Sequence, residues 1–182
     1  MEFKTYLKHK CSFKKIRLLR EEVKMIRAYD PAVTSTAEVL LTYSGLHAVW
    51  LYRLSHHLWC RHHCLSAQLV TQISRLFTGV EIHPGAKIGK RLLIDHGTGI
   101  VIGETAKIGN DVVLYHGVTL GSIANHGSSR HPKIGNRVFI GAGATILGAV
   151  TINDDVKVGA AAVVLHDVPA GKTIVGNPGH IC

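Results

Sequence analysis

Two polar blocks in the second half of the chain hold side chains that can do acid-base chemistry. Residues 94–99 contain His96, and residues 121–133 contain Arg130 and His131. The ordinary pKa of histidine lies near neutrality, so an imidazole can take a proton from a hydroxyl group and make its oxygen a nucleophile. His96 is therefore a candidate general base, and chemistry is expected at both blocks.

The elements that must position these blocks follow a six-residue repeat. An aliphatic residue opens each repeat, at Ile82, Ile88, Ile94, Ile102, Ile108, Leu114, Leu120, Ile134, Ile140, Ile146, Ile152, Val158 and Val164. The fifth position holds mostly small or β-branched residues, namely Ala86, Leu92, Thr98, Ala106, Val112, Val118, Val138, Ala144, Val150, Val156, Ala162 and Val168. Neither an α-helix nor an ordinary strand has this period. We therefore predict a parallel β-helix in which three repeats close one triangular coil around the aliphatic residues.

Both polar blocks interrupt this period. The repeat slips by two residues between Ile94 and Ile102, and it is lost altogether between Leu120 and Ile134. A solenoid can accept extra residues only where they loop outward. Loops on a rigid scaffold are also where sites are built, so the two interruptions are the expected functional loops.

The chain before the repeat has helical periodicity. We predict an N-terminal helical region over residues 1–78 and a β-helix catalytic domain over residues 79–182, with an extruded loop at 121–133. Asp30 followed by Pro31 predicts a helix N-cap with proline at the first helical position.

Two further helices are expected in the same region. Ser35 to Glu38 reads as a capping box that opens a helix whose apolar face runs through Leu54. Another helix is expected from about His63 to Phe77.

Composition and charge narrow the class of protein. The 182 residues suffice for one domain with a helical appendage, and the net charge of +9 is concentrated in the first twenty residues. This concentration indicates a solvated basic segment, with no nucleic-acid partner expected. The longest strongly apolar run free of charge, Val39 to Tyr52, is too short to cross a bilayer, so a cytoplasmic protein without membrane contact is expected. The four cysteines match neither a disulfide framework nor a CxxC site, which predicts reduced thiols.

Eight short motifs, read in order, resemble the serine O-acetyltransferases of the hexapeptide-repeat acyltransferase superfamily. They are Asp30-Pro31-Ala32, Gly45-Leu46-His47-Ala48, Ile82-His83-Pro84-Gly85-Ala86, Ile94-Asp95-His96-Gly97-Thr98-Gly99, Ile102-Gly103-Glu104-Thr105-Ala106, Gly117-Val118-Thr119-Leu120-Gly121, Arg130-His131-Pro132 and Val175-Gly176-Asn177-Pro178. The resemblance spans Asp30 to Pro178.

The resemblance implies a fold, a reaction and an assembly. The family folds as a left-handed parallel β-helix with an N-terminal α-helical cap, and its trimers place the site between subunits. Its members move an acetyl group from acetyl-CoA to the hydroxyl of L-serine, giving O-acetylserine in the first step of cysteine biosynthesis. A homotrimer or dimer of trimers is thus expected here, with L-cysteine as feedback inhibitor and no metal.

Site residues are carried over by the same resemblance. His96 matches the general base, Glu81 the acidic residue that orients it, and His131 the histidine that binds substrate or the developing oxyanion. Arg130 matches the residue that binds the serine carboxylate, and Asp30 and Asp95 match the residues that bind its ammonium group. A sugar acceptor would not require this combination of charges, so the residues favour an amino acid.

The acetyl-CoA site is implied along a groove of the β-helix. Gly121 matches the base of the loop, Ala142 and Ala160 present backbone groups, and Lys157 lies near the phosphates. The chain departs from the family after Gly121, because residues 122–125 read Ser-Ile-Ala-Asn where members often have Gly-Thr-Gly-Lys. The length of the loop is unchanged.

Other functions fit some of these residues. A hexapeptide-repeat acetyltransferase with another hydroxyl or amino acceptor has the same motifs. A γ-type carbonic anhydrase shares the fold, and His96, His126 and His131 could imitate its zinc ligands. A non-catalytic trimeric scaffold is a third alternative, against which the retention of both histidines argues.

The C-terminal residues indicate whether the chain can bind cysteine synthase. Family members that bind cysteine synthase do so with a flexible tail that ends in isoleucine. Here Ile181 precedes Cys182, and four residues after Pro178 can extend only about 14 Å. No stable complex with cysteine synthase is therefore expected.

Overall fold

The computed structural model describes residues 17–124 and 129–176. By its internal contacts the chain separates into two compact units, Met1–Tyr43 and Ser44–Cys182. The change from helices to strands falls later, between residues 78 and 81. Two helices of the expected helical region therefore belong to the same compact unit as the strands. His126, Ile181 and Cys182, which entered the sequence-based expectations, lie outside the described residues.

The first unit contains a helix over residues 17–29 and the helix α2 (Thr36–Thr42). Ser35 caps α2 as predicted, because its hydroxyl accepts a hydrogen bond from the Glu38 N–H at 3.1 Å. The predicted N-cap at Asp30 is wrong. Pro31 and Ala32 form a turn instead, in which the Asp30 carboxylate accepts from the Ala32 N–H at 2.9 Å.

The long helix expected from residue 36 onward is two helices. Tyr43 ends α2 with an extended backbone, and the helix α3 (Ser44–Trp59) begins at the next residue. After a short turn, the helix α4 (Cys64–Thr78) runs close to the predicted bounds and ends at Gly79, whose φ is 70°. The periodicity placed Leu46 and Val49 of α3 correctly on the buried face, but Leu54, assigned to the same face, is 50% exposed. It also missed the break, because Tyr43 carries no helix-ending signal of its own.

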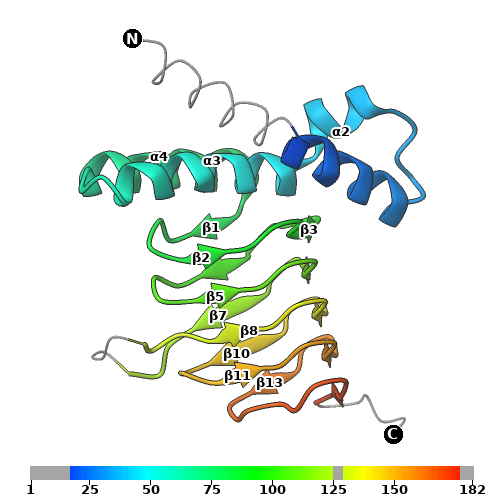
Figure 1. Cartoon of the computed structure of the whole chain (residues 1–182), viewed down its shortest axis with the longest axis vertical. Helices are drawn as coiled ribbons and strands as arrows, with labels where there is room; N and C mark the ends of the chain where they lie inside the picture. Colours follow the sequence, from blue (N-terminus) through cyan, green and yellow to red (C-terminus); the bar gives the residue numbers. More distant parts are fainter. Residues whose placement is uncertain (1–16, 125–128, 177–182) are drawn as a thin grey trace, which may run out of the picture. The chain divides into compact units, whose positions relative to one another are not determined.

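The second unit is a three-sided parallel β-solenoid closed at one end by α3 and α4 (Figure 1). Tyr52 of α3 donates to the Ala86 carbonyl at 2.7 Å. At Gly45, α3 comes so close to the first coil that a Cβ would overlap the Ile94 carbonyl oxygen. These helices bury the end of the solenoid core, which would otherwise face water.

All strand pairs in the solenoid are parallel. Within the described residues, the first sheet contains β1 (Glu81–Ile82), β4 (Val101–Ile102), β7 (Thr119–Gly121), β10 (Thr145–Leu147) and β13 (Val163–Val164). The second contains β2 (Lys87–Ile88), β5 (Lys107–Ile108), β8 (Lys133–Ile134) and β11 (Thr151–Ile152). The third contains β3 (Leu93–Asp95), β6 (Val113–Tyr115), β9 (Phe139–Ile140), β12 (Lys157–Val158) and β14 (Thr173–Ile174). Successive strands pass from sheet to sheet, so the chain winds about four coils.

The core of the solenoid follows the predicted repeat. The aliphatic first positions pair in register down each sheet, for example Ile82 with Ile102 and Ile102 with Leu120. Eleven of the twelve predicted fifth positions are buried beside them, and Thr98 is the exception. Thr98 is exposed, and Ile100, 1% exposed, takes its place in the core because the turn after β3 is two residues longer than its counterparts.

No helix within the described residues is both long and apolar enough to cross a membrane.

Candidate active site

His96 lies in the two-residue insertion that follows β3. Its backbone is left-handed, with φ at 60°, and its carbonyl oxygen accepts a hydrogen bond from the Ser44 hydroxyl at 3.2 Å. Its ring is exposed and stands edge-on to the ring of His116 in the next coil, at a centroid distance of 6.0 Å. The insertion thus presents the imidazole of His96 outward at a corner of the prism, where a substrate can reach it.

Glu81 begins β1, and its backbone N–H bonds to the Ile100 carbonyl directly after the His96 turn. Its carboxylate makes an ion pair with Arg75 of α4, with 2.9 Å between Arg75 Nη1 and Glu81 Oε2. Both side chains are partly exposed, so this pair contributes little to stability. The described structure contains no hydrogen bond between Glu81 and His96.

The second interruption leaves the prism between β7 and β8, and its described ends project outward (Figure 1). Arg130, near its return, makes an ion pair with Glu104, with 2.8 Å between Arg130 Nη2 and Glu104 Oε2. Glu104 comes from the turn after β4, in the coil before. The guanidinium has five N–H donors, so this contact leaves others for a ligand carboxylate.

His131 follows Arg130 and is only 9% exposed. The Thr105 hydroxyl lies 2.8 Å from His131 Nδ1, and the Thr105 N–H donates to the same nitrogen at 3.2 Å. On its other side the ring covers Gly103, where a Cβ would overlap His131 Cδ2 and Nε2. The turn Gly103 to Thr105 therefore cradles both Arg130 and His131.

The protonation of His131 is biased toward the neutral ring. Burial lowers its pKa from the ordinary value of 6.5, and the positive charge of Arg130 lowers it further, while Glu104 acts in the opposite direction. The pKa of His83 is lowered as well, chiefly by burial. A neutral His131 can donate one hydrogen bond and accept another at neutral pH.

The two histidines stand at opposite ends of the same strand. The His96 turn leads into β4, and the turn that holds His131 follows β4 directly. The described contacts within one chain bring Arg130 and His131 together, and they do not connect this pair to His96. Asp95 immediately precedes His96 at the end of β3.

Two of the residues expected to bind the co-substrate lie at the same corner of the prism as His96. Ala142 and Ala160 occupy the turns after β9 and β12, which stack below the turn of His96. The stacking is shown by backbone hydrogen bonds from Gly117 to Thr98, from Gly143 to His116 and from Ala161 to Ala142. His96 and both alanines therefore share one edge of the prism.

Gly121 and Lys157 lie elsewhere. Gly121 ends β7 at the base of the loop, where its carbonyl accepts from the Gly148 N–H at 3.1 Å. Lys157 begins β12, and its side chain is exposed on the outside of the third sheet. Asp30 belongs to the first unit, so its contacts are described within that unit alone.

Comparison with known proteins identifies the family. A family model described as bacterial transferase hexapeptide (six repeats) matches residues 131–166. A serine acetyltransferase of Staphylococcus aureus (strain Mu50) is 53% identical over 166 residues, which cover 91% of this chain and 78% of that relative. The chain belongs to the serine acetyltransferase family. Membership confirms the acyltransferase class expected from the motifs.

Solved serine acetyltransferases share the fold. The structure from Neisseria gonorrhoeae, in complex with serine, superposes with a TM-score of 0.86 at 40% identity and covers 91% of this chain and 68% of that one. The structure from Brucella abortus strain S19, in complex with coenzyme A, has a TM-score of 0.88 at 36% identity and covers 97% and 70%. This likeness confirms the left-handed β-helix.

Sequence reasoning about the serine acetyltransferase motifs missed two supporting residues. Gly103 and Thr105 entered only as members of the Gly-Glu-Thr motif, without a role. Their spacing from His131 could not signal contact, because it reflects the length of the loop. The available signal was the phase of the repeat, which places residues 103–105 and 131 at the same corner of neighbouring coils.

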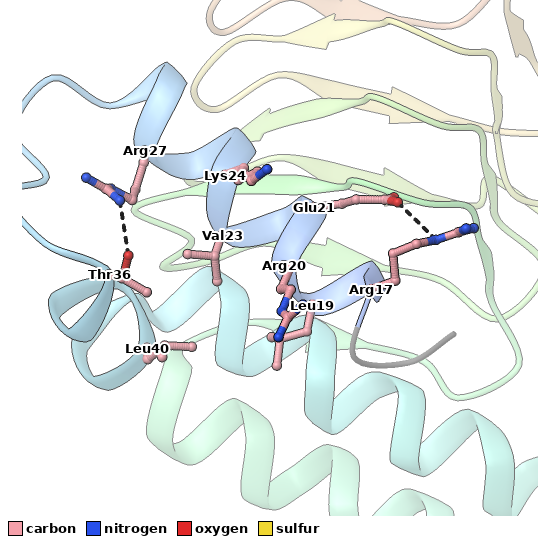
Figure 2. A pocket seen from close by; sticks show the side chains of 9 residues that line it. All are labelled: Arg17, Leu19, Arg20, Glu21, Val23, Lys24, Arg27, Thr36 and Leu40. Carbon is pink, nitrogen blue, oxygen red and sulfur yellow. Dashed lines mark hydrogen bonds and ion pairs between the residues drawn. The ribbon is translucent and has the colours of Figure 1, made fainter. Parts of the chain in front are cut away.

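The rest of the described structure offers no metal site, but it has a pocket away from the candidate site. Among the described residues, no group of three or more His, Cys, Asp or Glu side chains could hold a metal ion. A pocket of about 520 Å³ lies in the first unit between residues 17–27 and α2 (Figure 2), where Arg17 pairs with Glu21 and Arg27 with Thr36. None of the expected site residues lines it.

Proposed function

We propose that this chain transfers the acetyl group of acetyl-CoA to the hydroxyl of L-serine, with His96 as the general base. The observation that carries the proposal is the shared edge of the prism. His96 stands there on an exposed insertion, and Ala142 and Ala160 offer backbone groups in the stacked turns below it. A thioester bound along this edge would bring its acetyl group to the imidazole.

The chemistry follows from the needs of a hydroxyl nucleophile. His96 removes the proton of the serine hydroxyl while its oxygen attacks the acetyl carbonyl carbon. The carbon–sulfur bond then breaks, and the protonated imidazole returns the proton to the departing CoA thiolate. The products are O-acetylserine and CoA, and His96 is restored to its neutral form.

Glu81 is proposed to orient the His96 ring as the acid of an acid–histidine–nucleophile relay. It begins the strand beside the His96 turn, which supports this role. The Arg75 ion pair uses Oε2 of Glu81. The other carboxylate oxygen would accept the hydrogen bond from the imidazole and fix its tautomer.

Serine is proposed to bind through its charges. Arg130 would hold the carboxylate with the N–H groups that do not face Glu104, and His131 would donate to the substrate or to the developing oxyanion. Asp95 and Asp30 would bind the ammonium group. L-cysteine carries the same carboxylate and ammonium groups, so it would compete for this site as a feedback inhibitor. A solved family member in complex with cysteine supports this assignment for the chain.

The site is proposed to form between subunits of a homotrimer. His96 and His131 stand at opposite ends of β4, so a neighbouring prism must supply one of the two corners. The outer face of the same sheet carries exposed apolar side chains, with Val101 40% and Val163 62% exposed. Burial of such residues against a second copy would be favourable. A scattering mass of three chains is expected, a mass of six chains would indicate a dimer of trimers, and a mass of one chain would contradict the intersubunit site.

One assay tests the reaction. CoA release from acetyl-CoA is followed with a thiol reagent in the presence of L-serine, other amino acids or sugars. L-alanine is the matched control, because it has the same charged groups and no hydroxyl. Turnover with L-serine alone among these acceptors is expected. Equal or faster turnover with a sugar would instead favour an acetyltransferase with another acceptor.

A further inference from the structure

We propose that Thr105 is a positioning residue that keeps the proton of neutral His131 on Nε2, so that this ring acts as a hydrogen-bond donor in the site. The hydrogen bonds that carry this assignment lie within the chain itself. Only the identity of the group that receives the donated hydrogen bond rests on the function proposed above.

The hydroxyl of Thr105 has one proton to donate. Its oxygen accepts hydrogen bonds from two backbone N–H groups, those of Arg130 and His131, each at 3.1 Å. A hydroxyl oxygen has two lone pairs and one proton. Both acceptor positions are therefore filled, and the single proton remains to be donated.

The nitrogen that receives this proton is Nδ1 of His131. His131 Nδ1 lies 2.8 Å from the Thr105 hydroxyl oxygen and is the partner available for donation. The Thr105 N–H donates to the same nitrogen at 3.2 Å. A ring nitrogen that faces two donors must be unprotonated, because a proton there would meet two others. The proton of the neutral ring consequently lies on Nε2.

Gly103 borders the ring edge that carries Nε2. A Cβ at Gly103 would overlap Nε2 and Cδ2, so this edge of the ring lies directly against the glycine. Gly103 thus leaves room for the ring, while Thr105 holds its opposite side. Burial and the nearby Arg130 disfavour a second proton on the ring, which keeps His131 neutral.

This arrangement gives His131 and His96 different roles. His131 presents a fixed N–H group to the substrate or to the oxyanion, and its basic nitrogen is occupied by Thr105 and inaccessible to a hydroxyl proton. Of the two histidines, only His96 then has a free role as the general base of the function proposed above. A donor held in place before the reaction is more effective than one that must first reorient.

The direct test is ¹⁵N NMR of the full-length protein with labelled histidine side chains, with His131→Gln to assign the resonance. At pH 7.5 we expect the His131 pattern of a protonated Nε2 and an unprotonated Nδ1. A protonated Nδ1, or rapid exchange between the two tautomers, would overturn the proposal. This measurement needs no substrate and no turnover.

A second test compares Thr105→Val, which has nearly the same shape and no hydroxyl, with Thr105→Ser, which keeps it. Thr105→Val should lower kcat/KM for serine about tenfold and leave KM for acetyl-CoA unchanged. Because the Thr105 N–H still donates to Nδ1, the variant should weaken the preference for the Nε2 tautomer without abolishing it. Thr105→Ser should restore both readouts. Thr173→Val makes the same change at an exposed position of β14 and should alter neither.

The outcomes distinguish this proposal from the proposed function. If Thr105→Val keeps the rate and the full tautomer preference of the unsubstituted protein, the Thr105 hydroxyl does not position His131. If Thr105→Val fails to fold, the NMR result on the unsubstituted protein decides. If the expected tautomer is found and L-serine is not acetylated, the positioning role stands and the proposed acceptor is wrong.

Discussion

The imidazole of His131 occupies the space into which a side chain at Gly103 would extend. The two residues come from neighbouring coils, and the contact leaves no room for even a methyl group. It explains why the turn after β4 contains glycine where its backbone conformation does not demand one. The absence of a side chain at Gly103 leaves room for the ring of His131.

Gly103→Ala should therefore lower activity without unfolding the protein. The new Cβ must push the His131 ring away from its place, and a displacement of about 1 Å in a site can cost roughly 10²-fold in rate. Steady-state kinetics with serine measure the loss. Gly176→Ala is the control, because a Cβ there makes only ordinary contacts, the nearest at 3.4 Å from Ala162 Cα. Equal activity of both variants would show that the His131 ring tolerates displacement.

His96→Ala should abolish acetyl transfer and leave the fold intact, because the side chain is exposed and outside the core. Loss of a general base typically costs about two to four orders of magnitude. Circular dichroism checks the fold, and CoA release checks the rate. His166→Ala removes another exposed histidine and should turn over normally. Near-normal turnover by His96→Ala would refute the proposed mechanism.

Arg130→Ala should raise KM for serine and leave KM for acetyl-CoA nearly unchanged. Loss of a charge-assisted hydrogen bond corresponds to roughly 1.5–3 kcal/mol, or about ten- to a hundredfold in KM. The variant also leaves Glu104 without its partner, so the change is measured beside Glu104→Gln. Arg137→Ala is the control, since Arg137 pairs with Asp155. A matching loss of CoA affinity would place Arg130 in the co-substrate groove instead.

Stability should fall on acidification in a way that depends on His131. Burial, assisted by Arg130, holds the pKa of His131 below its ordinary value of 6.5, so the unfolded chain binds more protons at mildly acidic pH. The stabilising contribution is complete above pH 6.5 and is lost as the pH falls below it. Melting temperatures at pH 7.5 and 5.5 measure this loss.

The matched variants for that measurement are His131→Gln and His166→Gln. The first removes the buried titrating group and should shrink the drop in melting temperature between the two pH values. The second removes an exposed histidine and should leave the drop as in the wild type. An identical drop in all three proteins would exclude His131 as a source of the acid sensitivity.

Much of the fold could be predicted because the six-residue repeat can be recognised from residues that lie close together in the sequence. Each aliphatic first position and its fifth-position partner reach the same core, so burial selects apolar side chains at a constant spacing. The prediction of the core fails where the spacing between repeats departs from six residues. Thr98 was predicted to lie in the core, but Ile100 takes this place. The two extra residues in the His96 turn move the buried position two residues further along the chain.

The site could be predicted only as a set of candidate residues. The motifs pointed to His96, Arg130 and His131, and the structure adds the partners that hold them. Arg75 on Glu81 and Glu104 on Arg130 are such additions. Charge alone could not select these pairs, because the chain offers other acids and bases at similar separations along the sequence.

The sequence by itself determined the solenoid, the residues of its core and the two places where loops leave it, because each of these depends on spacing within one or two coils. The tertiary structure alone decided that Thr105 holds Nδ1 of His131 and that Gly103 makes room for the ring. These residues are 26 and more positions apart along the chain. They meet because one coil stacks on the next. The phase of the repeat indicates their shared corner, but only the tertiary structure shows which atoms touch there.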